Sequence, residues 1–389
     1  MIRSLFYPKA KKTSDIRAEN VLSVLTTIFT HERLSRKEII NQTSLAPSTV
    51  SKITNELMNK GILEKVGNLG KSVPGRKADL LSRSLGAYSV ATIHFTPEII
   101  RLGIIDLGYK VLDSKDLYFR NNFLEKDTNT VVEELKKMLE KNSGLKNVAA
   151  IGLALPDYPF DSKFIISSFE KAFKLPIYNM NNVEAIALYE CCFYLNNKNL
   201  NTFIFIYIGT GIGSAVIING NLYRGVSGKG CDFGHSYITD KPIVCRCKRK
   251  GCLEAVASEY FISSEITRHH HINPPLIGKE LIDCLSDYIQ KGDTFTFSLL
   301  KKVAFYFGKG VYNLVSILDP QEVIITGRIN MLNPLFSNLV EKSYLNYAKK
   351  GLFPIVPLRF IMLKKDSGLI GMAMFTFVSF FYEDLCMDY

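Results

Sequence analysis

The hydrophobic positions of the first 65 residues recur at helical spacing. Apolar side chains three or four positions apart predict three helices within Ile16–Glu64. Ser35, followed three residues later by Glu38, has the spacing of a capping box at the start of the second helix. Pro47 suits the first turn of the third helix, where its missing N–H has no partner. The segment Ile62–Val66 then predicts a strand.

From Leu85 onward, apolar runs of strand length alternate with helical patterns, which is typical of α/β proteins. The first three runs predict an antiparallel meander of strands at Ser89–His94, Ile100–Asp106 and Lys110–Tyr118. The later segments predict helices at 130–141 and 182–194, strands at 148–155 and 202–208, and a hairpin around Gly220. Further helices follow through Ile289 and Asn313, and then a strand at 322–326. Leu369–Phe381 is apolar but has only 13 residues, so we expect a buried C-terminal helix and no membrane span.

Charge is distributed unevenly along the 389 residues, whose net charge is +11. Residues 1–82 hold 14 Lys and Arg against 7 Asp and Glu, whereas the remainder holds 34 against 30. This asymmetry favours an N-terminal unit that binds a polyanion, although a solvated basic surface would give the same count. Met1–Lys12 lacks the apolar core of a signal peptide, and eight cysteines in a chain of this length indicate a reducing cytoplasm.

The third predicted helix carries the side chains that reading of a DNA major groove requires. Small polar residues near the start of such a helix reach base edges, and flanking basic residues contact phosphates. The turn-rich basic segment 68–77 follows it in the position of a wing. A three-helix module that binds another protein is the alternative. The candidate DNA contacts are Arg36, Pro47, Ser48, Thr49, Ser51, Lys52, Asn55, Lys71, Arg76 and Lys77.

Three cysteines and a histidine in the second half have the composition of a structural zinc site. Cys245, Cys247 and Cys252 lie within eight residues, and His235 precedes them. Three thiolates and one imidazole complete a tetrahedral set, which leaves no open position for catalysis. Free thiols on a loop are the alternative. His269–His271 are three adjacent residues that cannot converge on one ion, so we interpret them as an exposed polar stretch.

Several motifs together resemble repressors of the ROK family (repressor, open reading frame, kinase), which includes xylose and N-acetylglucosamine repressors. They are Arg17–Asn20, Leu34–Ile39, Leu45–Ile53, Leu57–Leu63, Pro74–Lys77 and the His235–Glu254 metal motif. The resemblance implies a winged helix-turn-helix, mainly α, followed by a two-lobed α/β ROK domain with the actin-like ATPase (ribonuclease H-like) fold. We expect the winged helix at 1–82, a first lobe at 83–200 that also binds helix 368–389, and a second lobe at 201–367.

Two elements of ROK kinases are altered. His94–Glu98 replaces the family's Asp-x-Gly-Gly-Thr phosphate loop, so both glycines are lost and Pro97 removes an N–H donor. Asn182 replaces the general-base Asp, and an amide cannot accept the hydroxyl proton. The second glycine loop, Gly209–Gly213, survives, either as a phosphate site or as a hairpin turn. We therefore expect no kinase activity.

The family's sugar-binding positions are partly retained. By resemblance, the sugar-binding residues are Asn181, Asn182, Asp232, His235 and Glu254. Asp232 is shorter than the family Glu, and Cys231 replaces a Gly, so the pocket is altered. Three hypotheses follow: a repressor gated by a sugar, a DNA-binding protein that uses the ROK domain as a scaffold, and an active sugar kinase. The first predicts operator DNA, a sugar effector and a homodimer or homotetramer, with no membrane partner.

Overall fold

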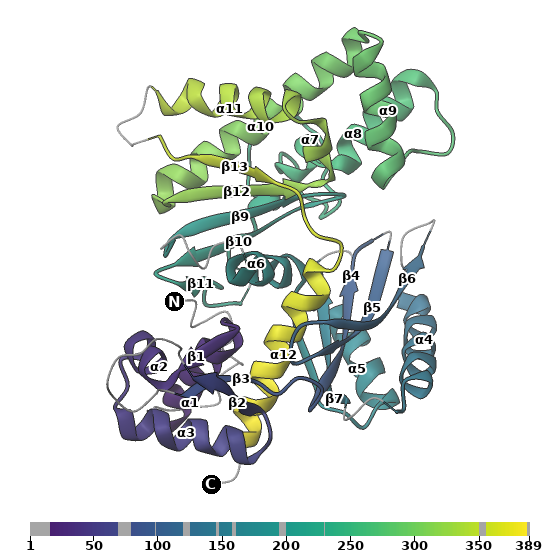
Figure 1. Cartoon of the computed structure of the whole chain (residues 1–389). Helices are drawn as coiled ribbons and strands as arrows, with labels where there is room; N and C mark the ends of the chain where they lie inside the picture. The colour runs from purple at the N-terminus through teal and green to yellow at the C-terminus, as the bar shows by residue number, and fades with distance from the viewer. Residues whose placement is uncertain are drawn as a thin grey trace. The chain divides into compact units, whose positions relative to one another are not determined.

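The computed structural model describes residues 16–68, 79–97, 99–119, 125–144, 148–157, 161–193, 200–228, 230–349 and 355–386 (Figure 1). The chain forms two compact units. The first contains residues 1–199 and 366–389, and the second contains residues 200–365.

The N-terminal part of the first unit is a three-helix module with a small sheet. Its elements are α1 (Ile16–Phe29), β1 (Arg33–Ser35), α2 (Arg36–Thr43), α3 (Pro47–Asn59), β2 (Leu63–Asn68) and β3 (Asp79–Arg83), with strand order β1-β3-β2. The predicted capping box is confirmed, because Ser35 N–H donates to Glu38 Oε2 over 2.7 Å and Glu38 N–H donates to Ser35 Oγ over 3.3 Å. Pro47 occupies the first turn of α3, as predicted.

A five-stranded sheet forms the centre of the rest of the first unit, with order β6-β5-β4-β7-β8. The predicted meander is confirmed, and two parallel strands extend it on the β4 side. Its elements are β4 (Ser89–Phe95), β5 (Ile99–Asp106), β6 (Val111–Tyr118), α4 (Thr128–Lys141), β7 (Val148–Leu155), α5 (Ser162–Ala172), β8 (Ile177–Asn181) and α6 (Asn182–Phe193).

The C-terminal helix α12 (Ser367–Cys386) lies on the face of this sheet opposite α4 and α5 (Figure 1). Ile151 and Leu153 belong to the core beneath α4 and α5. Gly152, between them, faces α12 on the other side of the sheet, because a Cβ built there would lie 2.2 Å from Thr376 Oγ1 of α12. The missing side chain thus allows α12 to approach β7 closely. Among the described residues, α12 alone is long and apolar enough to cross a membrane, and 67% of its apolar window is buried in the protein.

Helix α12 also contacts the N-terminal module. The ring of Phe381 lies 5.9 Å from that of Phe29 at the end of α1, and 5.2 Å from that of Tyr88. Lys60, which follows α3, forms a 2.7 Å ion pair with Asp384. Within the first unit, the last helix of the chain therefore joins the N-terminal module to the five-stranded sheet.

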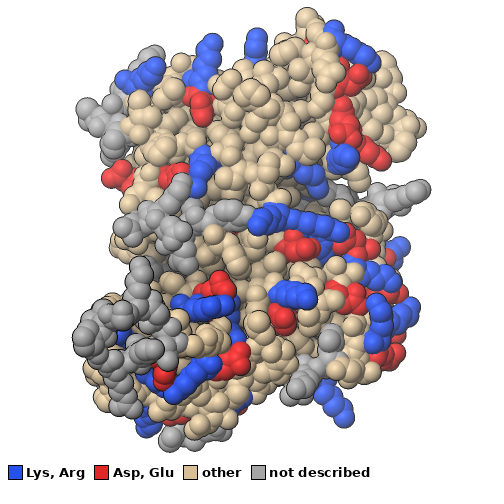
Figure 2. Space-filling model, viewed as in Figure 1, with Lys and Arg blue, Asp and Glu red and all other residues tan. Residues whose placement is uncertain are grey.

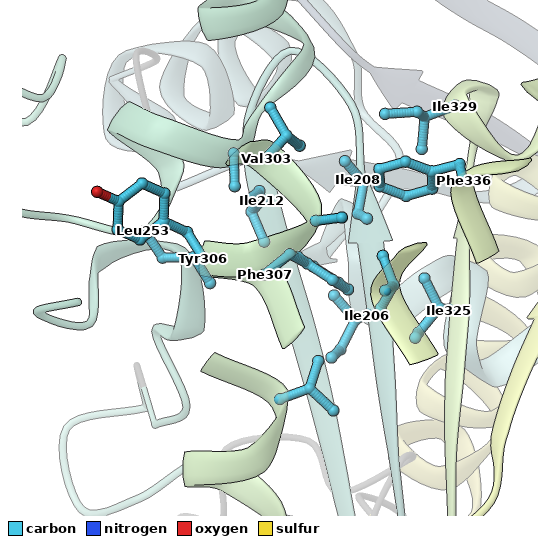
Figure 3. Packing of buried hydrophobic residues seen from close by; sticks show 14 of the residues in the cluster. Ile206, Ile208, Ile212, Leu253, Val303, Tyr306, Phe307, Ile325, Ile329 and Phe336 are labelled. Atoms are coloured by element: carbon cyan, nitrogen blue, oxygen red, sulfur yellow. The ribbon is translucent and has the colours of Figure 1, made fainter. Parts of the chain in front are cut away.

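The second unit has a five-stranded sheet of order β11-β10-β9-β12-β13 with helices packed against it. Ile206, Ile208 and Ile325 on its strands pack against Phe307 and Phe336 from the helices (Figure 3). Its elements are β9 (Phe203–Ile208), β10 (Ile212–Ile218), β11 (Asn221–Leu222), α7 (Glu254–Ala257), α8 (Glu259–His270), α9 (Gly278–Gln290), α10 (Thr294–Leu318), β12 (Glu322–Gly327), α11 (Leu335–Ala348) and β13 (Leu358–Ile361).

Candidate DNA-binding helix, metal centre and sugar site

Helix α3 has one apolar face and one polar face. Val50 and Leu57 are fully buried against the module core. The predicted DNA contacts on the other face comprise the exposed residues Pro47, Ser48, Lys52 and Asn55 and the half-buried residues Thr49 and Ser51. This spacing gives the helix a solvent-facing stripe of small polar side chains with one basic residue, Lys52, and such side chains can contact base edges and phosphates.

Arg36 connects α2 to α3 and is not a freely projecting side chain. Its Nε donates to Thr54 Oγ1 over 2.9 Å, and its Nη2 donates to Asn55 Oδ1 over 2.8 Å. This hydrogen bond uses the amide oxygen of Asn55 and does not involve its NH2 group. Arg36 therefore fixes the orientation of a predicted base-reading side chain.

Lys71, Arg76 and Lys77 of the predicted wing lie outside the described residues. Figure 2 shows blue and red side chains interspersed over much of the face in view. On the first-unit sheet and α4, lysines are paired with acids, as in Lys141 with Asp113 and Lys137 with Glu134. These lysines lie beside carboxylates, which reduce the positive charge of this surface.

The predicted metal ligands converge. His235, Cys245, Cys247 and Cys252 place their ligand atoms within 4.8 Å of one another. Cys245 Sγ lies 3.5 Å from His235 Nδ1, and Cys247 Sγ lies 3.7 Å from Cys252 Sγ. Tetrahedral Zn²⁺ with Zn–S of ~2.3 Å and Zn–N of ~2.0–2.1 Å implies separations of about 3.6 and 3.8 Å. The four residues therefore fit a zinc ion.

Tight turns hold these ligands in place. Cys245 N–H donates to Arg249 O over 2.7 Å, and Lys248 N–H donates to Cys245 O over 2.8 Å. Gly251 adopts φ +79°, and a Cβ there would lie 2.4 Å from Thr239 O, so only glycine fits. Gly251 therefore brings Cys252 back toward the first two cysteines.

Protons compete with a metal at this cluster. Burial raises the pKa of Cys245 to about 12. Burial also acts to raise the pKa of Cys247, but hydrogen bonds from Arg249, Cys245 and Cys252 together outweigh it and lower that pKa. Because a metal binds thiolates, its binding must displace the proton of Cys245.

The segment at the predicted phosphate loop is a closed turn between β4 and β5. Thr96 Oγ1 donates to Ile99 O over 2.7 Å and accepts from Ile99 N–H over 3.2 Å. Glu98 lies outside the described residues. A Cβ on Gly368 of α12 would lie within 2.7 Å of the His94 ring. Burial, and then the nearby Arg101, lowers the pKa of His94 to about 4, so the ring is neutral.

Asn182 is buried at the start of α6, and its Nδ2 donates to Phe95 O over 3.2 Å. A carboxylate here would have no proton to donate to that carbonyl. Asn181 Oδ1 accepts from Val183 N–H over 2.8 Å, and its Nδ2 donates to Asp157 Oδ2 over 2.7 Å. Asp157, exposed at the end of β7, was missed by the sequence analysis, although its position after a buried strand could have drawn attention to it.

The surviving glycine loop is occupied by a side chain of the protein. Glu254 Oε2 accepts from Ile212 N–H over 3.0 Å, and Gly209 N–H donates to Gly211 O over 2.8 Å. A Cβ on Gly211 would lie 2.5 Å from Glu254 Oε2. These two amide donors are spent on protein atoms, which favours the interpretation of the loop as a structural turn.

The other predicted sugar residues of the second unit differ in exposure. Glu254 is buried, and its Oε1 accepts from Arg246 Nη2 over 3.1 Å. Asp232 is exposed and lies 3.5 Å from Arg249 Nη2. His235 is half-buried and belongs to the metal cluster. Cys231 adopts φ +65°. This left-handed conformation is unfavourable for a residue with a β-carbon and is readily adopted by glycine.

Comparison with known proteins places these features in a family. The sequence profile described as "ROK family" matches residues 100–377. The chain belongs to the ROK family. A second profile, described as winged helix-turn-helix DNA-binding, matches residues 17–64. The two predicted parts of this ROK protein are thus each matched by a profile.

Related ROK proteins include transcriptional repressors. The xylose repressor of Caldicellulosiruptor bescii is 28% identical over 343 residues, which cover 82% of this chain and 85% of the relative. The xylose repressor of Bacillus subtilis is 27% identical over 338 residues, covering 83% and 85%. The regulator NagC of Escherichia coli is 21% identical over 345 residues, covering 84% of each chain.

Solved structures confirm the predicted fold. A ROK-family transcriptional regulator, described as a homologue of the E. coli MLC protein, matches with a TM-score of 0.73 and 19% identity, covering 96% of this chain and 98% of that one. A ROK hexokinase from Thermus thermophilus matches with a TM-score of 0.59 and 25% identity, covering 75% and 99%. The chain therefore combines a winged helix-turn-helix with a ROK domain of the actin-like ATPase fold.

Proposed function

We propose that this ROK protein is a sugar-responsive transcriptional repressor of carbohydrate-utilisation genes, xylose genes among them. The observation that carries the proposal is the polar stripe of α3, which includes Lys52, presented by a winged-helix module that is joined to a ROK domain. The names of the xylose repressors and of NagC support the same function. A protein that binds operator DNA works in the cytoplasm, with no membrane partner.

A two-fold symmetric homodimer, or a homotetramer built from such dimers, would place two α3 helices in successive major grooves. The two half-sites would then lie about 34 Å apart, one helical turn, or a multiple of it. Sugar binding would change the spacing of the two modules and release the operator. Lys71, Arg76 and Lys77 would contribute phosphate and minor-groove contacts from the wing.

The sugar site in this proposal consists of Asn181, Asn182, Asp232, His235 and Glu254. Amide and carboxylate groups of this kind exchange hydrogen bonds with vicinal hydroxyls. Zn²⁺ bound by His235 and the three cysteines would have a structural role, because four protein ligands leave no open position. It would hold His235 and the loop before Glu254 in place.

Kinase activity is not part of the proposal. Asn182 cannot take up a proton from a sugar hydroxyl, and its amide is hydrogen-bonded to Phe95 O. The turn at Thr96 is closed on itself, and Glu254 accepts from the glycine loop. Incubation of the pure protein with ATP and a panel of hexoses and pentoses should yield no sugar phosphate; measurable phosphorylation would refute this part of the proposal.

Footprinting on the source organism's genomic DNA tests the main proposal. We expect discrete, two-fold symmetric protected sites beside sugar-utilisation genes, and loss of protection when one sugar is added. The absence of any discrete site would refute DNA recognition. Discrete sites combined with no calorimetric heat from any monosaccharide or phosphosugar would instead favour the scaffold hypothesis, in which the ROK domain senses no sugar.

A further inference from the structure

Two consecutive carboxylates near the end of α12 contact different parts of the first unit. Glu383 Oε2 accepts a 2.6 Å hydrogen bond from the hydroxyl of Tyr178 on β8. Asp384 Oδ2 forms a 2.7 Å ion pair with Nζ of Lys60, the residue that follows α3. The candidate DNA-reading helix and the strand that ends at Asn181 are therefore joined through two neighbouring residues of one helix.

Strand β8 has a neighbour on one side only. Among the described strands it pairs with β7, and it forms one edge of the sheet. Its last residue is the candidate sugar ligand Asn181, whose amide donates to the exposed Asp157 and accepts from Val183 N–H. A sugar hydroxyl that bonds to Asn181 adds to or replaces these contacts, and so changes the hydrogen bonding at the end of β8. Tyr178 lies about 10 Å back along the same strand, so a shift of this end reaches its hydroxyl.

The contact with Lys60 fixes the end of α3 that is farthest from its candidate DNA contacts. Lys60 is held twice, since its Nζ pairs with Asp384 and its carbonyl oxygen accepts from the Tyr88 hydroxyl over 3.2 Å. The 13 residues of α3 span about 20 Å, and Ser48 and Thr49 lie at the opposite end. A small tilt of α3 about Lys60 therefore moves these two residues the most.

The N-terminal module is attached by two contacts of different kinds. At the end of α1, the buried Tyr109 hydroxyl donates to Phe29 O over 2.7 Å, and the buried Arg83 donates to the same oxygen over 3.0 Å. The Lys60–Asp384 pair is partly accessible to water, with side chains 32% and 40% exposed. Exposed ion pairs contribute little to stability, whereas breaking a buried hydrogen bond leaves unsatisfied groups. The end of α1 is thus a fixed joint, and the end of α3 is a contact that opens more easily.

We propose that Glu383 and Asp384 couple sugar binding at Asn181 to the orientation of α3. A shift of β8 moves Glu383 through the Tyr178 hydroxyl, and Asp384 moves with it because the two residues are consecutive in a helix. The contact with Lys60 then opens, and α3 turns about the fixed joint at the end of α1. The proposal rests on the sugar response proposed above, but the coupling of β8 to α3 is measurable without sugar or DNA.

Hydrogen–deuterium exchange of the full-length, zinc-loaded protein tests the coupling itself. Tyr178→Phe removes only the hydroxyl that binds α12, and it lies outside the N-terminal module. It should raise the exchange rate of the amides in Leu57–Ile62 by about 3-fold or more, because α12 then holds Lys60 less firmly. Tyr118→Phe is the matched control, since Tyr118 is exposed on β6 at the other edge of the same sheet. It should leave these amides unchanged.

Operator binding with and without D-xylose tests the consequence. In the wild type, ~10 mM D-xylose should weaken binding to a footprinted operator fragment by about 10-fold, which is the sugar response. Asp384→Asn and Tyr178→Phe should each reduce this response by about 3-fold or more, with affinity for D-xylose in the absence of DNA within about 2-fold of wild type. Asp113→Asn, which breaks the ion pair with Lys141, is the matched control and should keep the full response.

The outcomes separate the coupling from the repressor function. Unchanged exchange at Leu57–Ile62 in a folded Tyr178→Phe protein would overturn the coupling, whatever the protein binds. A sugar response that Asp384→Asn and Tyr178→Phe both leave intact would overturn it as well. A wild type that binds no operator, or whose operator binding does not change with D-xylose, would count against the proposed function, and the exchange experiment alone then decides the coupling.

Discussion

Substitution of Phe381 by alanine should loosen the N-terminal module from the rest of the first unit. Phe381 on α12 is 1% exposed, and its ring lies 5.9 Å from Phe29 of α1, 5.2 Å from Tyr88 and 6.1 Å from Phe377. Removal of a fully buried Phe ring costs about 3–5 kcal/mol, which includes the cavity left behind. The aromatic pairs contribute about 0.5–1.5 kcal/mol within that range.

Urea denaturation followed by circular dichroism measures this loss as a lower free energy of unfolding of the first unit. Phe380→Ala is the matched control, because Phe380 is the neighbouring residue of the same helix and is only half-buried. It should cost less than about 1.5 kcal/mol. A double-mutant cycle with Phe29→Ala should give a coupling energy of about 0.5 kcal/mol or more. Equal effects of the two α12 substitutions, or zero coupling, would refute the packing argument.

Three further predictions concern the metal, the DNA contacts and pH. The wild type should hold one zinc ion per chain by elemental analysis; Cys252→Ser should lose it and melt more than ~5 °C lower, whereas Cys284→Ser should retain it. Lys52→Ala should weaken operator binding uniformly across sequences, and it should reduce the slope of log binding constant against log salt concentration by about 1. Lys136→Ala on α4 should change neither the affinity nor this slope. An unchanged slope for Lys52→Ala would exclude a phosphate contact. Burial, and then Arg101, lowers the pKa of His94 to about 4, against about 6.5 in the unfolded chain. The unfolded chain therefore binds more protons between these values, and the contribution of neutral His94 is complete above pH 6.5 and lost as pH falls through 4. Between pH 7.5 and 4, the wild type should lose about 3 kcal/mol more than His94→Gln in denaturation experiments; identical pH profiles would contradict this.

The elements that the sequence predicts well are those with strong local signals. The capping box at Ser35, the meander from Ser89 to Tyr118 and the buried helix at Leu369–Phe381 are confirmed, because periodicity and capping are local properties. Helices α5 and α11 and the strands β8 and β13 were not predicted. Strand β13, Leu358–Ile361, is short and half-buried, so its sequence shows little alternation. Its position depends on parallel pairing with β12, which is a non-local interaction.

In the candidate site, too, features with a local sequence signal were predicted and contacts made by tertiary packing were not. The metal ligands were predicted because their residue types and spacing are specific, and His235 and the three cysteines do converge. The partners of Glu254 were not predicted, because Ile212 and Arg246 reach it only through tertiary packing. The bond from Asn182 to Phe95 O likewise joins residues 87 positions apart. Spacing along a chain carries no information about such contacts.

The place of α12 after the second unit has a consequence for biosynthesis. Phe29 and Lys60 of the N-terminal module leave the ribosome well before their partners Phe377, Phe381 and Asp384. The whole second unit is synthesised between them. A nascent chain therefore exposes the apolar surface around Phe29 until α12 has been made. Products that stop before α12 would present that surface to chaperones and proteases, which would favour chains that contain α12 in the DNA-binding population.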